Sequence, residues 1–266
     1  MISLYRIGAV VFRHLMTMKR MSWFVEINYW TVLDIIIFGS LGKATAMMAP
    51  SSASGAVIQA LITNAVLWYI VLRGAITIGF TLLNELFDAN LIALFATPLR
   101  TLEWIISCTI VGSIAALINL TIGWIMALLV FNCNVFAIGI SSIAVICSLL
   151  VSGWTIGLIL MSILLFVGKK GTGLAFAVCW SLVPFSCVYY PLDVLPSFLR
   201  TIASFIPMAQ VFTATRTTIM TGASPWPPIL ISFGLNIFYL ALAIILFATM
   251  FKRSKKRGLA RLELEW

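Results

Sequence analysis

Long runs of apolar residues, separated by short polar connections, make up most of the chain. Six runs approach or exceed the roughly 20 residues that a helix needs to cross the hydrocarbon core of a bilayer. They lie at Trp23–Gly42, Val57–Phe80, Ile105–Phe131, Ala137–Val167, Gly173–Pro191 and Pro228–Phe251. The pattern therefore predicts an all-α membrane protein with six transmembrane helices in one domain, residues 23–251.

The residues before the first run follow a different pattern. Within Ile2–Met21, Arg6, Arg13 and Arg20 recur every seven residues, so a helix places them on one face, with apolar residues beside them. This predicts that residues 1–22 form an amphipathic helix at the membrane interface, with its arginines toward lipid phosphates. The alternative is a basic flank that only sets the orientation of the first span.

The connection between the fifth and sixth runs, residues 192–226, is too long and too apolar for a plain loop. Prolines divide it into two pieces, Ser197–Ile206 and Met208–Met220. Each piece is too short to span a bilayer, so we expect re-entrant half-helices. The alternative is an amphipathic external loop that packs on the bundle.

Composition and charge agree with a membrane location. The chain is 62% hydrophobic and 9% charged, whereas soluble domains have roughly 25% charged residues. Most of the 17 lysines and arginines flank apolar runs that would face the cytoplasm if both termini lie there. The positive-inside rule therefore predicts cytoplasmic N- and C-termini and a basic cytoplasmic tail at residues 252–266. This distribution accounts for the net charge of +9 without a nucleic-acid partner.

Residues that catalysis would need are sparse. His14 is the single histidine, and it precedes the spans, so a histidine-built metal site or a Ser-His pair within them is excluded. The segment Lys169–Gly173 lacks the GxxxxGK[ST] pattern of a phosphate loop. We therefore expect no cofactor on this chain, and energy for any work would come from another chain or from an ion gradient. An enzyme that uses a carboxylate, Asp34 or Glu26, is the remaining catalytic alternative.

Four polar residues of the first two spans are candidates for an intramembrane site: Asp34, Arg73, Glu26 and Gln59. Charges within a membrane usually face the bundle interior or one another. We expect Arg73 to pair with Asp34 or Glu26, on an inward-facing polar side of the second span. The alternative is that Arg73 extends toward the headgroups.

The stretch Asn84–Glu103, between the second and third runs, offers the largest surface to the cytoplasm. It combines the acids Glu85 and Asp88 with a short helix-like apolar set that ends at Pro98. We interpret this stretch, residues 84–103, as the place where a partner protein pushes on the spans.

Two segments resemble the type-2 permeases of ABC exporters, and with the N-terminal helix and six spans the likeness covers essentially the whole chain. The first is NELFDANLIALFATPLRTLEWI, Asn84–Ile105, which is similar to that family's first cytoplasmic loop. The second is Leu174–Arg216, which is similar to the family's fifth span and the "YP…LP…P…R" region after it. The matching residues there are Tyr190, Pro191, Leu195, Pro196, Pro207 and Arg216.

The resemblance implies an inner-membrane permease that pairs with a second permease copy, as a homodimer, and with two cytoplasmic ATP-binding subunits. ATP and magnesium would be bound by those subunits. Residues 84–103 would be the coupling loop, with Glu85, Asp88 and Pro98 at the ATPase contact, and residues 192–226 would form re-entrant helices at the external mouth.

The function that follows is ATP-driven export of an amphiphilic substrate, such as a glycan, a lipid-linked compound or a drug-like molecule. The substrate would leave the cytoplasm or the inner leaflet. The alternative is an ion-coupled secondary transporter or channel that uses Asp34 and Arg73.

Overall fold

The protein is helical throughout the part that the structure describes. The computed structural model describes residues 3–18, 21–48, 54–88, 90, 97 and 99–257, and no strand occurs among them. Four helices are long and apolar enough to cross a membrane: α3 (Ser54–Phe87), α5 (Thr101–Phe131), α6 (Ser141–Val167) and α11 (Trp226–Arg257). An all-helical fold with several membrane-length helices, as the apolar pattern predicts, is therefore confirmed.

The first and fifth expected spans are not among these four helices. Helix α2 (Met21–Met48) is long, but Asp34 and Lys43 interrupt its apolar character. The fifth run is divided into α7 (Thr172–Ser181) and α8 (Val183–Ser186), after the turn η1 (Gly168–Gly171). Pro184 lies at the start of α8, where it has no amide hydrogen to continue the α7 hydrogen bonds. The described residues thus account for four of the six expected crossings.

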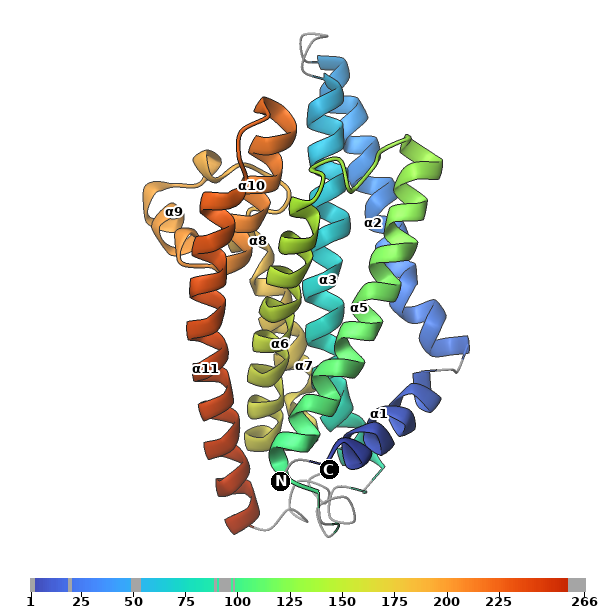
Figure 1. Ribbon diagram of the computed structural model, residues 1–266, viewed down its shortest axis with the longest axis vertical. Coiled ribbons are helices and arrows are strands. Elements are labelled where there is room, and N and C mark those ends of the chain that lie inside the picture. Colours follow the sequence, from blue (N-terminus) through green and yellow to red (C-terminus); the bar gives the residue numbers. More distant parts are fainter. Residues whose placement is uncertain are drawn as a thin grey trace.

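Helix α3 is the centre of the bundle. It contacts α2, α5, α6 and α10, while α6 lies between α3 and α11 (Figure 1). Most residues of α3 between Ile62 and Leu86 are buried, whereas α5 and α11 keep exposed apolar faces, such as Leu129 and Ile237. A buried central helix with more exposed neighbours is the arrangement expected when the outer faces meet lipid or another chain.

Small residues allow the helices to approach α3 closely. A Cβ atom added to Gly157 of α6 would lie 2.7 Å from Cβ of Ile78, and one added to Gly112 of α5 would lie 2.6 Å from Cγ1 of the same residue. One added to Gly153 would lie 3.2 Å from the carbonyl oxygen of Val71. The small-residue spacing of Gly153 and Gly157 therefore marks the α3–α6 contact, as such spacings do in membrane helices.

Buried hydrogen bonds join the outer helices to the bundle. Asn119 of α5 donates to Oδ1 of Asn28 and Oγ1 of Thr31, both on α2, at 3.0 and 2.8 Å. Asn236 of α11 accepts a bond from Ser152 of α6 at 2.8 Å, and its amide group donates to the carbonyl of Ser148. Polar side chains that bond across helices are a common stabilising device within membranes.

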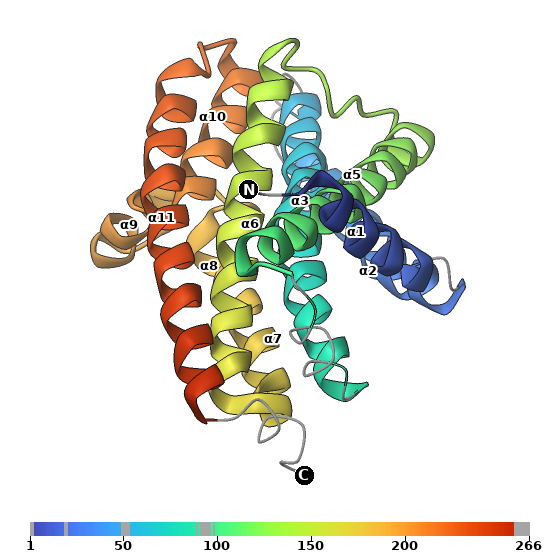
Figure 2. The same ribbon diagram turned by 60° about the horizontal axis from the view of Figure 1, so that its bottom comes forward.

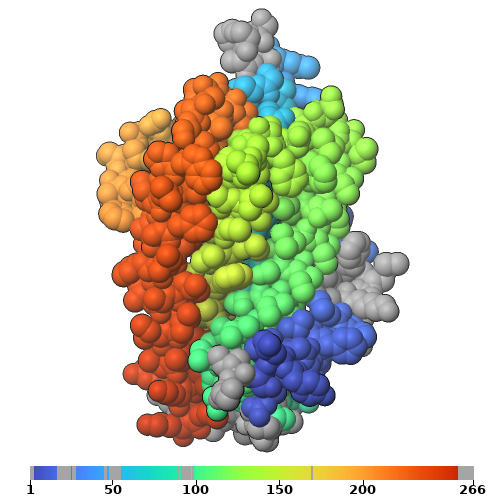
Figure 3. All heavy atoms as spheres, in the orientation of Figure 1, coloured from blue at the N-terminus to red at the C-terminus, as the bar shows by residue number. Residues whose placement is uncertain are grey.

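Short helices cover the two ends of the bundle. Helix α1 (Leu4–Met18) lies across α5 at the end where α11 finishes, which Figure 2 brings forward and Figure 3 shows at the surface. On the chain between α8 and α11 follow η2 (Leu192–Val194), α9 (Ser197–Ser204) and α10 (Pro207–Thr221). The last two lie where two short helices are expected. Helix α11 continues to Arg257, so the first residues of the expected tail are helical.

Candidate functional site at the α1 end of the bundle

Helix α1 has one buried face and one exposed apolar face. Ile7, Val10 and His14, spaced three and four residues apart, are less than 10% exposed and face the bundle. The opposite face exposes large apolar side chains: Leu4, Tyr5, Phe12 and Met16. One face of α1 thus packs on the bundle, while its exposed apolar side chains are available to a surface outside the bundle.

A buried carboxylate at the end of α3 holds the second half of α1. Glu85 is 3% exposed, and its Oε2 accepts a 2.7 Å hydrogen bond from Nη2 of Arg13. Nε2 of His14 lies 3.5 Å from Oε1 of the same carboxylate, while Nδ1 lies 2.8 Å from the carbonyl of Val10. A buried carboxylate needs such partners because an isolated charge is costly away from water.

A second buried carboxylate, Glu103, holds the beginning of α1. Glu103 is in the first turn of α5, where a negative charge is favoured by the helix dipole. Its side chain accepts the backbone N–H of Ser3 at 2.8 Å and that of Arg100 at 2.9 Å. Nη1 of Arg6 lies 3.7 Å from the same carboxylate. Helix α1 is thus fastened to the end of α3 and to the start of α5.

Two arginines of the predicted stripe contact acidic side chains of the bundle, and the expected contact of the stripe with lipid phosphates stays a prediction. The seven-residue spacing does place Arg6 and Arg13 on one side of α1, but their guanidinium groups contact Glu103 and Glu85 of the bundle. They remain 39% and 44% exposed. The third arginine of the stripe, Arg20, lies outside the described residues.

The expected coupling residues differ in accessibility. Glu85 lies in the last turn of α3 and is covered by α1, so its side chain does not face an approaching protein. Asp88 is the first residue after the end of α3, and it is exposed. Its backbone N–H bonds to the carbonyl of Asn84 at 2.9 Å. Pro98 lies outside the described residues. Asp88 is therefore the acid that a partner can reach.

The intramembrane polar residues of the sequence prediction are partly brought together. Oδ2 of Asp34 on α2 accepts a 2.5 Å hydrogen bond from the hydroxyl of Tyr69 on α3. The guanidinium carbon of Arg73 lies 5.5 Å from the centre of the Tyr69 ring, a cation–π distance, and Arg73 attracts Asp34 electrostatically. Tyr69 therefore contacts both Asp34 and Arg73, and the pairing of Arg73 with Asp34 or Glu26 stays a prediction.

Gln59 makes other contacts. Gln59 donates to the carbonyl of Asn134 at 2.6 Å and to Oγ1 of Thr63 at 3.2 Å, which ties the first turns of α3 to the connection after α5. The side chain of Glu26 lies outside the described residues. Tyr189, which follows α8, stacks on Phe38 of α2 with ring centres 3.7 Å apart.

At the other end of the bundle, Arg216 of α10 is 9% exposed and donates to backbone carbonyls. Its Nη2 donates to the carbonyls of Cys187 and Val188, at 3.1 and 3.0 Å. Burial lowers the pKa of the Arg216 guanidinium from its ordinary value. Cys187 has a positive φ of 56°, so the arginine fixes the chain where α8 ends in an uncommon conformation.

The remaining residues of the sequence pattern shape the same region. The hydroxyl of Tyr190 donates to the carbonyl of Pro184. Pro191 and Pro196 directly precede η2 and α9, and Pro207 is the first residue of α10, a position that suits proline because its missing N–H has no helical partner there. The prolines therefore begin the short helices.

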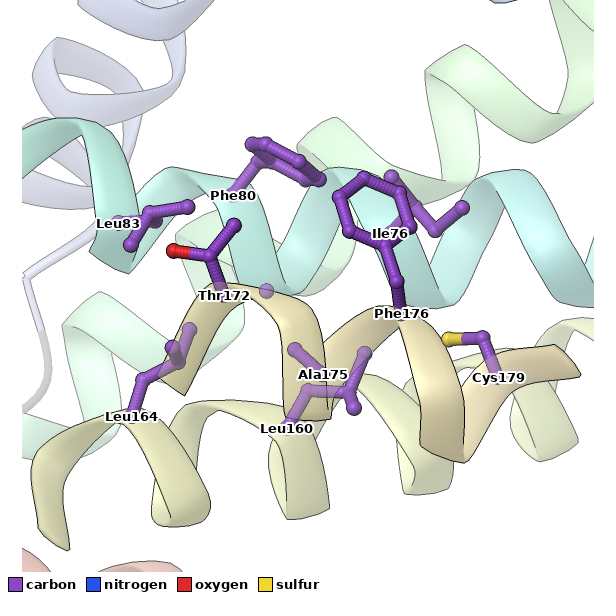
Figure 4. Close-up of a pocket in the computed structure, with 10 residues that line it drawn as sticks. Ile76, Phe80, Leu83, Leu160, Leu164, Thr172, Ala175, Phe176 and Cys179 are labelled. Atoms are coloured by element: carbon purple, nitrogen blue, oxygen red, sulfur yellow. The ribbon is translucent and has the colours of Figure 1, made fainter. Parts of the chain in front are cut away.

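Two of the cavities among the described residues lie within the helix bundle. The first, about 20 Å³, is a narrow crevice into which Phe80 of α3 and Phe176 of α7 point (Figure 4). The second, about 210 Å³, is lined by α6, α7, α10 and α11 and includes Thr155 and Tyr239. Neither resembles a metal centre, and no cluster of three or more metal-binding side chains occurs among the described residues.

No protein-family model matches the chain, and no curated protein matches it either.

Glu103, His14 and Tyr69 make contacts that the predicted site did not include. Glu103 and His14 have a signal in the sequence: the acid occupies the third position of a helix, and the histidine falls on the buried side of α1. Tyr69 has none, because it lies in a continuous apolar run and its bond to Asp34 depends on the packing of α2 on α3.

Proposed function

We propose that the chain is the transmembrane permease subunit of an ATP-driven ABC exporter in the inner membrane. A separate partner hydrolyses ATP, and the permease moves an amphiphilic substrate, such as a glycan, a lipid-linked compound or a drug-like molecule, out of the cytoplasm or the inner leaflet. The observation that carries this proposal is the fastening of α1. Arg13 binds Glu85 at the end of α3, and Arg6 lies by Glu103 at the start of α5.

This fastening has a mechanical consequence. Asp88 is exposed, and along the chain it lies between the end of α3 and the start of α5, the two ends that α1 bridges. A force applied there by a partner reaches α3 and α5 together, because α1 prevents their ends from moving independently. Helix α3 is the buried centre of the bundle, so its displacement is transmitted to α2, α6 and α10.

The proposed topology has six crossings with both termini in the cytoplasm. Helix α2 and the pair α7–α8 supply the two crossings beyond the four membrane-length helices. Helix α10, part of the proposed re-entrant region, packs inside the bundle. Its Phe212 is fully buried beside Trp68, and the Phe212 carbonyl accepts a 3.1 Å hydrogen bond from Asn64.

The proposed transport path runs between two copies of the chain rather than through one. Drug-sized ligands occupy pockets of roughly 300–1,000 Å³. The two bundle cavities, about 20 and 210 Å³, are smaller than that. A homodimer would place the exposed apolar faces of its helices against each other or against lipid.

The test uses the full chain, purified with its native partners and reconstituted in lipid. We expect a cytoplasmic ATPase to copurify in stoichiometric amount, with Mg²⁺-dependent hydrolysis. Asp88→Lys reverses the charge of an exposed residue at the proposed contact and should reduce the copurified ATPase at least about fivefold, a coupling of roughly 1 kcal/mol.

Asp193→Lys is the matched control, because Asp193 is exposed and lies in η2, outside the coupling loop. It should leave the ATPase bound. If wild type copurifies with no ATPase, or if both variants behave alike, the proposal is wrong.

A second candidate function, an ion-coupled transporter or channel, is favoured by the contact of Asp34 with Tyr69 beside Arg73. It predicts that transport follows an ion gradient without ATP and is abolished by Asp34→Asn. An exporter driven by ATP should keep its nucleotide dependence in that variant.

A further inference from the structure

The exposed side of α11 changes from apolar to cationic along its length. Phe238, Leu242 and Ile245 are 59%, 48% and 60% exposed, and α11 runs along the surface of the molecule (Figure 3). Spacings of four and three residues place these side chains on one side of the helix. Lys252 and Lys256 are also exposed, and they continue the same side because seven and eleven residues are close to whole helical turns.

The opposite side of the same turns is fixed on the bundle. Phe247 and Phe251 are 0% and 4% exposed, and their rings stack with centres 5.9 Å apart. The ring centre of Phe247 also lies 5.9 Å from that of Trp104 on α5. Ser254, about one turn after Phe251, is 6% exposed. The rotation of the C-terminal turns of α11 is therefore set by packing, and their exposed side faces away from the bundle.

Four cationic side chains are exposed within these turns, which we call the cationic end of α11: Lys252, Arg253, Lys255 and Lys256. Nζ of Lys255 lies 5.6 Å from the centre of the Phe251 ring. In the part of the chain that the structure describes, no ion pair joins any of the four to an acidic side chain. Residues 252–266 contain six basic and two acidic side chains, so the acids of this segment are too few to neutralise it. The cationic end is thus complementary to a negatively charged surface.

The continuity of the exposed side favours a lipid surface over a soluble acidic protein. Lys252 is seven residues after Ile245, about 10 Å along the helix. The headgroup region extends roughly 5–8 Å beyond the hydrocarbon core on each side of a bilayer. Side chains of a helix lean toward its N-terminus, and a lysine carries its ammonium several ångströms from the backbone. With Ile245 among acyl chains, Lys252 and Lys256 therefore reach the phosphates, whereas a soluble partner needs no apolar residues on that side.

We propose that the cationic end of α11 binds anionic phospholipids, with Lys252, Arg253 and Lys256 at their phosphates and the acyl chains along Leu242 and Ile245. The contact selects lipids by headgroup charge, which goes beyond setting the orientation of the last span. It needs neither a nucleotide nor a second subunit, so it is independent of the transport function proposed above.

The experiment is native mass spectrometry of the full chain in detergent, titrated with phosphatidylglycerol or with phosphatidylcholine of the same acyl chains. Wild type should retain phosphatidylglycerol in preference to phosphatidylcholine. Each cation near an anionic lipid surface is worth about fivefold in affinity, so Lys252→Gln, Arg253→Gln and Lys256→Gln together should lower the preference at least about tenfold. Circular dichroism checks that the variant remains helical.

Two further variants separate the cationic end from general charge. Lys252→Arg with Lys256→Arg keeps the charge and should keep the preference. Lys43→Gln, Lys170→Gln and Arg200→Gln together remove three charges from exposed positions of α2, η1 and α9, and this variant should change the preference less than about twofold, well below one lost cation contact.

Several results would overturn the proposal. Equal retention of phosphatidylcholine, or equal losses in the two triple variants, would show that no lipid is selected at α11. A loss of stability with unchanged lipid preference would show that these cations serve only the dipole at the helix C-terminus. Displacement of the lipid by glycerol 3-phosphate at equal concentration would show that the phosphate alone is recognised. Loss of a copurified ATPase with unchanged lipid preference would make the cationic end a protein-docking surface instead.

Discussion

Arg13 and Arg216 fasten short helices at opposite ends of the same bundle, but by different means. Arg13 binds the carboxylate of Glu85 at 2.7 Å and stays 44% exposed. Arg216 is 9% exposed and binds the carbonyls of Cys187 and Val188. One contact is an ion pair that faces water on one side, and the other is a buried donor to backbone.

Because of this difference in exposure, the α1 junction can exchange partners, whereas the α10 junction cannot. The half-exposed guanidinium of Arg13 is open to water, salt and competing anions, which weaken such pairs. Breaking the Arg216 contacts would instead leave backbone carbonyls unpaired among apolar side chains, which costs the full desolvation of those groups. We therefore interpret the α1 end as the part that responds to partners, and the α10 end as a fixed part of the scaffold.

The largest effect is expected at the fixed end. Arg216→Met keeps much of the side-chain volume but removes both hydrogen bonds, and it should lower the free energy of unfolding by about 2–4 kcal/mol. Denaturant unfolding in mixed micelles measures this loss. A change below about 0.5 kcal/mol would show that the carbonyls of Cys187 and Val188 do not depend on this arginine, and the comparison would fail.

Glu85→Gln is expected to come next. The amide is close in size to the carboxylate, but it removes the negative charge that pairs with Arg13 and leaves one acceptor oxygen where Arg13 and His14 each face one, so we expect a loss of about 1–3 kcal/mol in the same assay. If Glu85→Gln leaves the free energy of unfolding unchanged while Arg216→Met lowers it, the charge of Glu85 does not hold α1.

Arg13→Gln should cost about as much as Glu85→Gln, about 1–3 kcal/mol, because it leaves the buried carboxylate of Glu85 without the guanidinium that pairs with it. Its cost should shrink as salt is raised from 0.05 to about 0.5 M, since screening weakens the wild-type pair. An effect independent of salt would indicate lost packing rather than a lost ion pair.

Asp193→Asn should have the smallest effect. Asp193 is 89% exposed on its side chain and lies 3.7 Å from Arg200, so it is a surface ion pair with an expected contribution below about 0.5 kcal/mol. The variant sharpens the comparison, because it shows that burial, rather than the presence of an ion pair, sets the size of the effect. A loss as large as that of Glu85→Gln would contradict this explanation.

The sequence was sufficient to predict most of the helices. Apolar run length decides where α3, α5, α6 and α11 lie, and proline positions decide where α9 and α10 begin. The helix boundaries differ from the predicted ones at polar ends. Helix α3 continues past Phe80 to Phe87, because the buried Glu85 finds Arg13 and His14 of α1 as partners and can remain in a helix.

The partners of the charged residues were harder to predict. The spacing of Arg6 and Arg13 indicates a shared face, but the same pattern fits lipid phosphates and buried acids equally well. Only the tertiary structure brings residues 72 and 97 positions apart, Glu85 with Arg13 and Glu103 with Arg6, into contact. For the same reason, Tyr69 was absent from the predicted contact between Asp34 and Arg73.

The central claim is that α1 is held against α3 and α5 through its charges, so that a partner at Asp88 acts on both helices. Hydrogen–deuterium exchange of residues 4–16 in the reconstituted chain tests it most directly. We expect slow exchange in wild type and at least about tenfold faster exchange in Glu85→Gln, a local loss of roughly 1.4 kcal/mol, with α10 unchanged. Exchange of α1 that is equally fast in both proteins would contradict the account.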